Sequence, residues 1–187
     1  TANILLKTDT PPDAILALTF TESAAYSMRR RLLEIIGSLA YRVNIHTFHG
    51  FANEIIQTYP DRFPEIMGAT HIGQVEQIKI FQKIIEETAL NKLKPYGNPF
   101  YYLQSLMKAI SQLKREDIGH IHYQKLKDKE EKETELALIY SLYEERLRRE
   151  RLYDYDDMIM EMIKTLRQDK DFLLNLQENF HYILADE

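Results

Sequence analysis

The sequence contains no cysteine and only six glycines and six prolines among its 187 residues. Without cysteine, neither a disulfide framework nor a thiolate metal site can form. The low glycine and proline content argues against a loop-rich or disordered chain. No apolar run has the length of a membrane-spanning helix, and no signal-peptide pattern opens the chain. We therefore expect a globular, cytoplasmic protein without a membrane partner.

The charge balance also excludes some functions. Hydrophobic residues make up 44% of the chain and charged residues 28%, which is ordinary for a globular domain. A formal net charge of −5 argues against a protein that coats nucleic acid non-specifically. It leaves room for a local basic stripe, because electrostatic steering depends on where the charges lie.

Two further features concern the limits of the chain. The sequence starts at Thr1, without Met, in an apolar stretch, and it stops at Glu187 directly after a strand-like run. Because a domain seldom begins and ends inside core elements, we interpret the chain as a piece of a longer protein. The phosphate-binding pattern G-x-x-x-x-G-K-[ST] occurs nowhere in it.

The first third of the chain alternates between strand and helix patterns. Residues 15–20 form a short apolar run bounded by breakers, which suits a strand buried on both faces in a parallel sheet. Thr21 can cap the helix that follows. A second short strand at residues 43–45 leads to a helix that Thr47 can cap and Pro60 ends. This order predicts an α/β unit.

From Gln74 onward, apolar residues recur only at helical spacing. The pattern predicts helices over residues 75–85, 100–113 and 136–147, and a charged stretch at 125–135 precedes the last. We find no convincing strand here, so this region is expected to be an all-helical insertion.

The α/β pattern resumes near the end. Asp154 is an expected N-cap, with Asp157 in the first turn of a helix whose apolar face covers residues 158–166. A short helix at 172–176 and an apolar strand at 181–185 close the chain. The predicted fold class is therefore α/β, a partial parallel sheet with flanking helices plus an all-helical inserted subdomain.

Two acids, Asp186 and Glu187, follow the last strand. Open α/β sheets bind ligands at the carboxyl ends of their strands. An Asp there can hold Mg²⁺ on nucleotide phosphates, and an adjacent Glu can orient or deprotonate the attacking water. A plain loop or a helix cap is the commoner explanation of such a pair.

Hydroxyl and aromatic residues stand at the ends of the first two strands: Thr19, Phe20 and Thr21, then Thr47, Phe48 and His49. Hydroxyls and helix N-terminal N–H groups suit phosphate contacts, and an exposed Phe can stack on a base. The alternative is that Phe20 lies in the core and Thr21 is only a cap. A metal site on His46 and His49 is disfavoured, because no acid or Cys accompanies them at ligand spacing.

Three charged clusters allow two interpretations each. The acids of residues 153–157 can bind a cation, although helix capping and a solvated face explain them more simply. The arginines of residues 29–31 and 146–151 can meet phosphate or form ordinary solvated helix faces.

The order of these segments is more informative than any one of them. LALTFTESAAYSMRRRL, IHTFHGF, LYDYDDMI and YILADE resemble, in this order, the UvrD/Rep/PcrA family of superfamily 1 DNA helicases. Thr19 to Met28 match motif Ia, Thr47 to His49 match motif Ib, and Leu152 to Asp157 match an LDFDD-like hallmark. Ala185 to Glu187 match the VDE of motif II, with Ala where Val is usual. The resemblance covers essentially the whole chain, although the helical insertion matches by position and character more than by motif.

The resemblance implies a domain organisation. Residues 1–65 and 151–187 would form most of a RecA-like motor domain, called 1A, and residues 66–150 the helical subdomain 1B. The family couples hydrolysis of ATP, with Mg²⁺, to 3′-to-5′ movement on single-stranded DNA and to duplex unwinding. In the family, 1B helps to hold the duplex.

The resemblance also assigns roles to residues. Those expected to contact single-stranded DNA are Thr19, Phe20, Thr21, Thr47, Phe48 and His49. Asp186 would hold Mg²⁺ and Glu187 would activate water. The expected partners are single-stranded DNA, its junction with duplex, and the remainder of the helicase chain. Because the phosphate loop is absent, we expect residues 1–187 alone to hold no ATP or Mg²⁺, and neither to hydrolyse ATP nor to unwind DNA.

Three other interpretations stay open. The chain can be a module that grips single-stranded DNA without ATP, or a protein whose helical insertion serves a protein partner. It can also belong to a helicase–nuclease of the same superfamily, because a nuclease domain would lie outside these residues.

Overall fold

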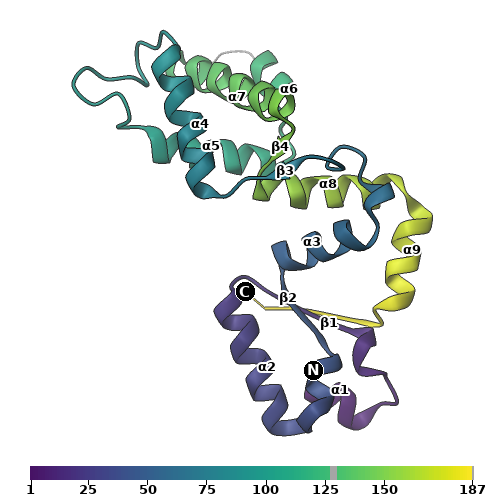
Figure 1. The fold of residues 1–187 in the computed structure, drawn as a ribbon. Coiled ribbons are helices and arrows are strands. Elements are labelled where there is room, and N and C mark those ends of the chain that lie inside the picture. The colour runs from purple at the N-terminus through teal and green to yellow at the C-terminus, as the bar shows by residue number, and fades with distance from the viewer. Residues whose placement is uncertain (127–129, 187) are drawn as a thin grey trace. The chain divides into compact units, whose positions relative to one another are not determined.

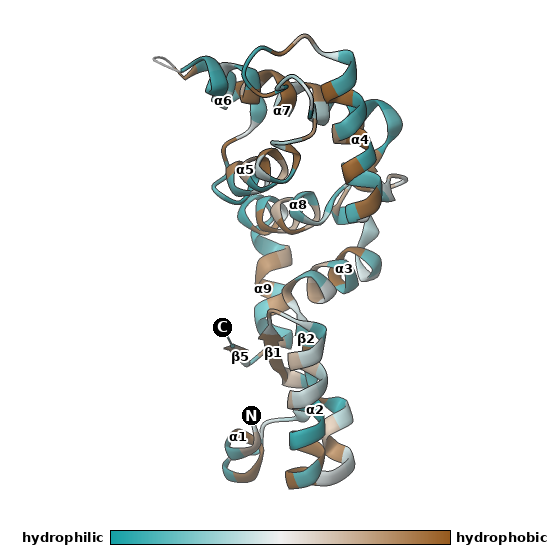
Figure 2. Cartoon of the chain, turned by 90° about the vertical axis from the view of Figure 1, so that its left-hand side faces the viewer, coloured by the Kyte–Doolittle hydropathy of each residue, from teal (hydrophilic) through white to brown (hydrophobic). Residues whose placement is uncertain are grey.

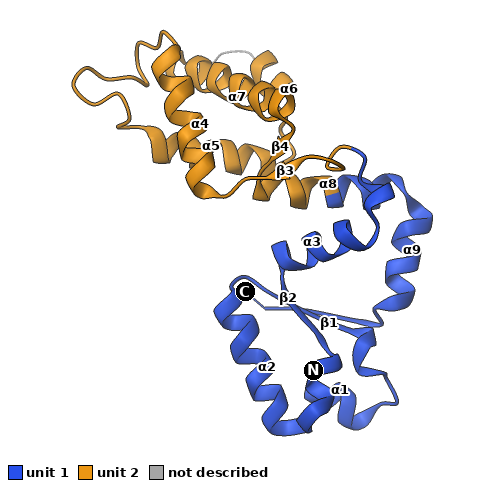
Figure 3. Ribbon diagram, viewed as in Figure 1, with its two compact units in different colours: residues 1–64, 162–187 blue, residues 65–161 orange. Residues whose placement is uncertain are grey.

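The computed structural model describes residues 1–126 and 130–186. The chain forms two compact units, one from residues 1–64 and 162–187 and the other from residues 65–161 (Figure 3). Among the described helices, none is both long and apolar enough to cross a membrane.

The first unit alternates helices and strands (Figure 1). Its elements are α1 (Ala2–Lys7), η1 (Pro12–Ala14), β1 (Ile15–Thr19), α2 (Glu22–Ile36), η2 (Gly37–Arg42), β2 (Asn44–Thr47), α3 (Phe48–Thr58), η3 (Pro60–Arg62), the last part of α8 (Tyr155–Gln168), α9 (Lys170–Asn179) and β5 (Tyr182–Ala185).

The sheet of this unit is parallel, with strand order β2-β1-β5. Every residue of β1 is buried, because a strand lies on each of its edges and helices cover it. The register pairs Thr19 with Thr47 and Leu18 with Ala185, so the three strands end at one edge. The predicted α/β fold with a small parallel sheet and flanking helices is confirmed.

The core of the first unit lies between α2 and the sheet. Ala25 and Leu32 of α2 pack with Ile15, Ala17 and Ile45 of the strands. Gly37 ends α2 with a φ of 63°, a left-handed conformation that glycine adopts without a side-chain clash.

The second unit is mainly helical. It contains β3 (Thr70–His71), α4 (Gln74–Glu87), α5 (Leu103–Arg115), α6 (His120–Lys125), α7 (Glu131–Glu150), β4 (Leu152–Tyr153) and the first turns of α8. Hydrophobic and hydrophilic residues alternate along these helices, as expected for amphipathic helices with one buried side (Figure 2).

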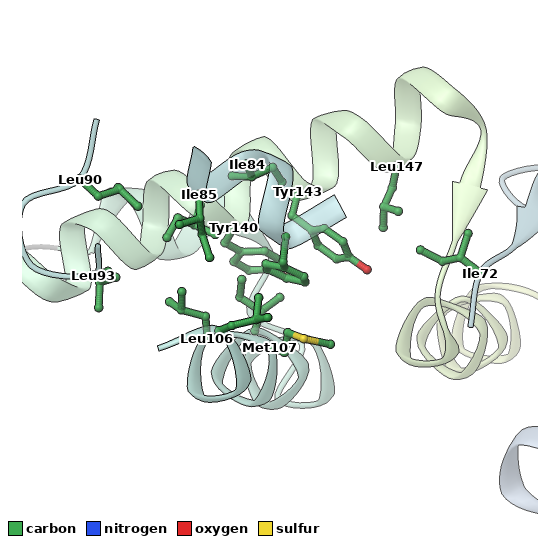
Figure 4. Packing of buried hydrophobic residues seen from close by; sticks show 14 residues of the cluster. Ile72, Ile84, Ile85, Leu90, Leu93, Leu106, Met107, Tyr140, Tyr143 and Leu147 are labelled. Carbon is green, nitrogen blue, oxygen red and sulfur yellow. The ribbon is translucent and has the colours of Figure 1, made fainter. Parts of the chain in front are cut away.

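One hydrophobic cluster forms the core of this second unit. Leu106 and Met107 of α5 face Tyr140 and Tyr143 of α7 (Figure 4). Phe81 of α4 stacks on Tyr143 with ring centroids 4.4 Å apart. These long helices are the ones that the apolar spacing predicted.

One expectation for the second unit needs correction. The insertion is not all-helical, because β3 pairs in parallel with β4, Thr70 opposite Leu152. A two-residue strand is too short to show a periodicity. The two compact units divide between Glu161 and Met162 inside α8, and the first turn of α8 belongs to the second unit, where Lys114 of α5 pairs with Asp154 and Asp157.

Candidate functional site

The end of β1 exposes an aromatic ring beside a helix cap. Thr21 caps α2, since its hydroxyl oxygen accepts a hydrogen bond from the Ala24 N–H at 3.1 Å. Phe20 has 67% of its surface exposed, which overturns the alternative that placed it in the core. Thr19 is fully buried, and its hydroxyl has no hydrogen-bond partner within the described residues.

The end of β2 repeats this arrangement. Thr47 caps α3 by accepting from the Gly50 N–H at 2.9 Å, and its own hydroxyl donates to Glu22 Oε1 at 3.0 Å. Phe48 is 39% exposed and His49 is half-buried. Because Thr19 pairs with Thr47 in the sheet, the two strand ends are neighbours.

Gly50 lies close to the side chain that caps α3. A Cβ built at this position would lie 3.0 Å from Thr47 Oγ1, a tighter contact than nine in ten real Cβ contacts. The hydrogen bond from Thr47 to Glu22 thus joins α2 to the start of α3 through a crowded contact. No sequence pattern singles out Glu22 or Gly50, because the sheet register sets their partners.

Two of the expected DNA contacts have buried side chains. Thr19 is 0% exposed and Thr47 is 6% exposed. The Thr47 hydroxyl donates its hydrogen to Glu22. Both threonines lie opposite each other where β1 and β2 end.

His46, which lies near this edge of the sheet, contacts two residues of α3. His46 Nε2 lies 3.3 Å from Glu54 Oε2, and its ring lies 6.3 Å from that of Phe51. In the part of the chain that the structure describes, no group of three or more His or acidic side chains is placed to hold a metal ion.

Asp186 lies at the same edge of the sheet, next to the end of β1. Its backbone N–H donates to Leu18 O at 2.9 Å, continuing the ladder between β5 and β1. The side chain is exposed. Glu187, the expected water-activating residue, lies outside the described residues.

A pocket of about 340 Å³ lies in the first unit beside Asp186. Ala2 of α1 and the face of α2 that carries Arg31 contribute to its walls. The full lining is Ala2, Ala24, Ser27, Met28, Arg31, Leu32, Ile35 and Asp186.

The acidic cluster at the start of α8 is buried in the second unit. Asp154 and Asp157 cap the helix reciprocally: each accepts a hydrogen bond from the backbone N–H of the other, at 2.9 and 3.0 Å. Capping was the favoured interpretation. The solvated face was wrong, because Asp154 is 3% exposed and Asp156 8% exposed.

The cation that lies among these acids is the ammonium group of Lys114. Lys114 Nζ lies 2.8 Å from Glu144, 2.9 Å from Asp154 and 2.6 Å from Asp157. Tyr143 donates its hydroxyl hydrogen to Asp154 at 2.8 Å. The cluster therefore ties α5, α7 and the first turn of α8 together.

Burial and like charges change the protonation of this cluster. Burial raises the pKa of Asp157 to about 7, with Asp154 and Glu144 adding to the shift while Lys114 opposes it. The pKa of Asp154 is lowered in spite of burial, because Lys114 and several hydrogen bonds stabilise its charged form.

Comparison with known proteins now decides the family. A family model described as the UvrD/REP helicase N-terminal domain matches residues 1–187. The chain belongs to this family. Similar proteins include the ATP-dependent DNA helicase PcrA of Staphylococcus aureus (strain Mu50), which is 28% identical over 186 residues. The ATP-dependent DNA helicase Rep of Buchnera aphidicola is 29% identical over 177 residues.

These relatives are much longer than the chain. The PcrA match covers 100% of this UvrD/REP-type chain but 24% of PcrA, and the Rep match covers 94% and 26%. The chain thus spans about a quarter of the length of the curated relatives it matches.

Proposed function

We propose that the chain is the N-terminal part of an ATP-dependent DNA helicase that moves 3′ to 5′ on single-stranded DNA and unwinds duplex. The observation that carries the proposal is the shared edge of the sheet. Two exposed aromatic strand ends, at Phe20 and Phe48, stand at the same edge as Asp186. This arrangement would bring a strand-gripping surface and a phosphate-facing carboxylate onto one rigid sheet.

The first unit would act as motor domain 1A and the second as subdomain 1B. This assignment follows the division at residues 64 and 161 in place of the boundaries expected from the sequence. The second unit would contact the junction of single-stranded and duplex DNA. The remainder of the same protein, including a second motor domain, would complete the helicase.

The strand ends of β1 and β2 would grip the DNA. Phe20 and Phe48 offer rings for stacking on bases, which tolerates any sequence, as a translocating protein requires. Thr21 and His49 would face the backbone, where the N-terminal turns of α2 and α3 favour phosphate. Buried Thr19 and Thr47, at the ends of β1 and β2, would hold these residues in place.

The edge near Asp186 would take the Mg²⁺–ATP. Its exposed carboxylate beside a pocket fits the oxygen ligands that Mg²⁺ prefers. Bound Mg²⁺–ATP supplies the phosphoryl group that hydrolysis transfers to water. Asp186 would hold the metal, and Glu187 would orient the attacking water. The phosphate loop that such a site needs would come from another part of the protein.

Single substitutions in the full-length protein test the strand-gripping surface. We expect Phe20→Ala to weaken binding of a single-stranded oligonucleotide by about fivefold or more, because a base-stacking contact contributes about 1–3 kcal/mol. His49→Ala should also weaken this binding, because it removes a contact to the DNA backbone. Fluorescence anisotropy at several salt concentrations gives the affinity and its salt dependence. Tyr26→Ala is the matched control, because this ring is 70% exposed and lies within α2, not at the end of a strand. Unchanged affinity in both variants would refute the proposed surface.

A further inference from the structure

The three consecutive arginines of α2 have three different surroundings. Arg29 donates to the carbonyls of Ala40, Val43 and Ile45, at 3.3, 3.4 and 3.2 Å. It therefore fastens α2 to η2 and β2. Arg30 and Arg31 are both exposed. Only Arg31 lines the pocket beside Asp186.

We propose that Arg31 binds the phosphates of the nucleotide in the pocket that it shares with Asp186. The inference rests on the proposed function, because it takes the ligand of Asp186 to be Mg²⁺–ATP. It adds a residue that would hold the phosphate chain directly from α2.

The first argument is that Arg31 is uncommitted. Within the described residues it makes no hydrogen bond or ion pair, whereas Arg29 makes three hydrogen bonds to carbonyls. In particular, no ion pair joins Arg31 to Asp186 in this part of the chain, although both line one pocket. Arg31 and Asp186 thus line one pocket without forming an ion pair among the described residues. Both side chains are available to a ligand that carries a negative and a positive group, such as nucleotide phosphates with Mg²⁺.

The second argument is the shape of the pocket. Ala24, Ser27 and Arg31 follow one another at intervals of three and four residues, so they lie on one face of α2. The small side chains leave room beside the guanidinium, and Ala2 of α1 adds little bulk. Arg30 lies about 100° further round the helix, which explains why it is absent from the lining.

The third argument is chemical. A guanidinium is always charged and presents a planar fork of N–H donors that matches the oxygens of a phosphate. A carboxylate repels phosphate unless a cation lies between them, so Asp186 would act through Mg²⁺. Arg31 would then neutralise oxygens that the metal does not reach.

The experiment uses the full-length protein and separates nucleotide binding from catalysis. Binding of a fluorescent, non-hydrolysable ATP analogue with Mg²⁺ is measured by titration in the absence of DNA. We expect Arg31→Ala to weaken this binding by about tenfold or more, because charge-assisted hydrogen bonds are lost. Arg31→Lys keeps the charge but not the fork, so it should lie between wild type and Arg31→Ala. Arg30→Ala, the matched control, should bind like wild type.

Two further measurements keep the inference falsifiable. Affinity for a single-stranded oligonucleotide and the melting temperature should stay unchanged in Arg31→Gln, which keeps a polar side chain without the charge. Wild-type nucleotide affinity in Arg31→Gln, or equal losses in the Arg30 and Arg31 variants, would overturn the inference. If wild-type protein binds no nucleotide at all, the proposed function itself fails. If nucleotide binds and the Phe20 and His49 variants lose DNA affinity while Arg31→Gln behaves as wild type, only the inference fails.

Discussion

At the scale of the residue, Thr47 shows how a side chain can serve a binding surface without being part of it. Its buried hydroxyl donates to Glu22 and accepts from Gly50, so it links the start of α2 to the start of α3. Because Thr47 is the last residue of β2 and directly precedes exposed Phe48, loosening this link should disturb both strand ends at once.

We expect Glu22→Ala to lower the free energy of unfolding by about 1–3 kcal/mol, since a part-buried hydroxyl loses a charged acceptor. Glu22→Gln keeps an acceptor oxygen and should cost less. Urea unfolding of the single and double variants with Thr47→Val gives the coupling between the two residues. Glu34→Ala, an exposed position on α2, is the control. Additive effects of the Glu22 and Thr47 substitutions would contradict the link.

Gly50→Ala should also be destabilising, although alanine is normally favoured over glycine within a helix by about 1 kcal/mol. The new Cβ would lie 3.0 Å from Thr47 Oγ1 and would push the cap of α3 aside. A lower melting temperature and weaker binding of single-stranded DNA are expected. Gly119→Ala is the comparison, because a Cβ there meets nothing within 4 Å. A melting temperature that rises in Gly50→Ala would show that the contact is slack.

At the scale of the element, the charged cluster around Lys114 holds three helices. Its side chain is 5% exposed, and its ammonium group faces carboxylates from α7 and from the start of α8. Removing one partner from a buried ionic group leaves the others uncompensated, which costs far more than the group contributes when complete.

Lys114→Met should therefore destabilise the second unit by about 3–5 kcal/mol. Chemical denaturation followed by circular dichroism measures this loss. Lys108→Met changes an exposed lysine on the same helix and should have little effect. A small loss in Lys114→Met would mean that water or a counter-ion replaces the ammonium group.

The same cluster predicts a dependence of stability on pH. The pKa of Asp157 is raised from 3.8 to about 7, so between these values the folded protein holds a proton that the unfolded chain has released. The contribution of Asp157 to stability must then fall as pH rises through this window, and level off above it. The lowered pKa of Asp154 acts in the opposite direction, and only at pH below its ordinary range.

Asp157→Asn removes the titrating group. Its free energy of unfolding should decline less between pH 4 and 7 than that of the wild type, as measured by denaturation at a series of pH values. Glu145→Gln, an exposed acid on α7, should leave the pH profile unchanged. Parallel profiles for Asp157→Asn and the wild type would show that Asp157 is not the titrating group.

At the scale of the whole molecule, the chain should not act as a motor by itself. The sequence of residues 1–187 contains no G-x-x-x-x-G-K-[ST] loop, so the lysine and backbone cradle for the phosphates are missing from it. We expect purified residues 1–187 to show no DNA-stimulated ATP hydrolysis in a phosphate-release assay, with the full-length protein as the positive comparison. Turnover above background would contradict this.

Much of the architecture was predictable, because it depends on local patterns. The apolar run of β1 bounded by breakers, the caps at Thr21 and Thr47 and the long helices of the second unit all follow from neighbouring residues. So does the reciprocal cap between Asp154 and Asp157, which needs only a spacing of three.

By itself the sequence thus determined the order of the strands and helices, the motifs at the strand ends and the resemblance to one helicase family. The tertiary structure decided which neighbouring side chains are available to a ligand. Arg29 donates to backbone carbonyls, whereas Arg31 lines a pocket. Phe20 is exposed, whereas Thr19 is buried. The reason is distance along the chain: Lys114 meets Asp154 across 40 positions, and Thr47 meets Glu22 across 25. The periodicity of apolar residues predicts which side of a helix or strand is buried. It does not predict side-chain partners that lie tens of residues apart in the sequence, because tertiary packing brings these together.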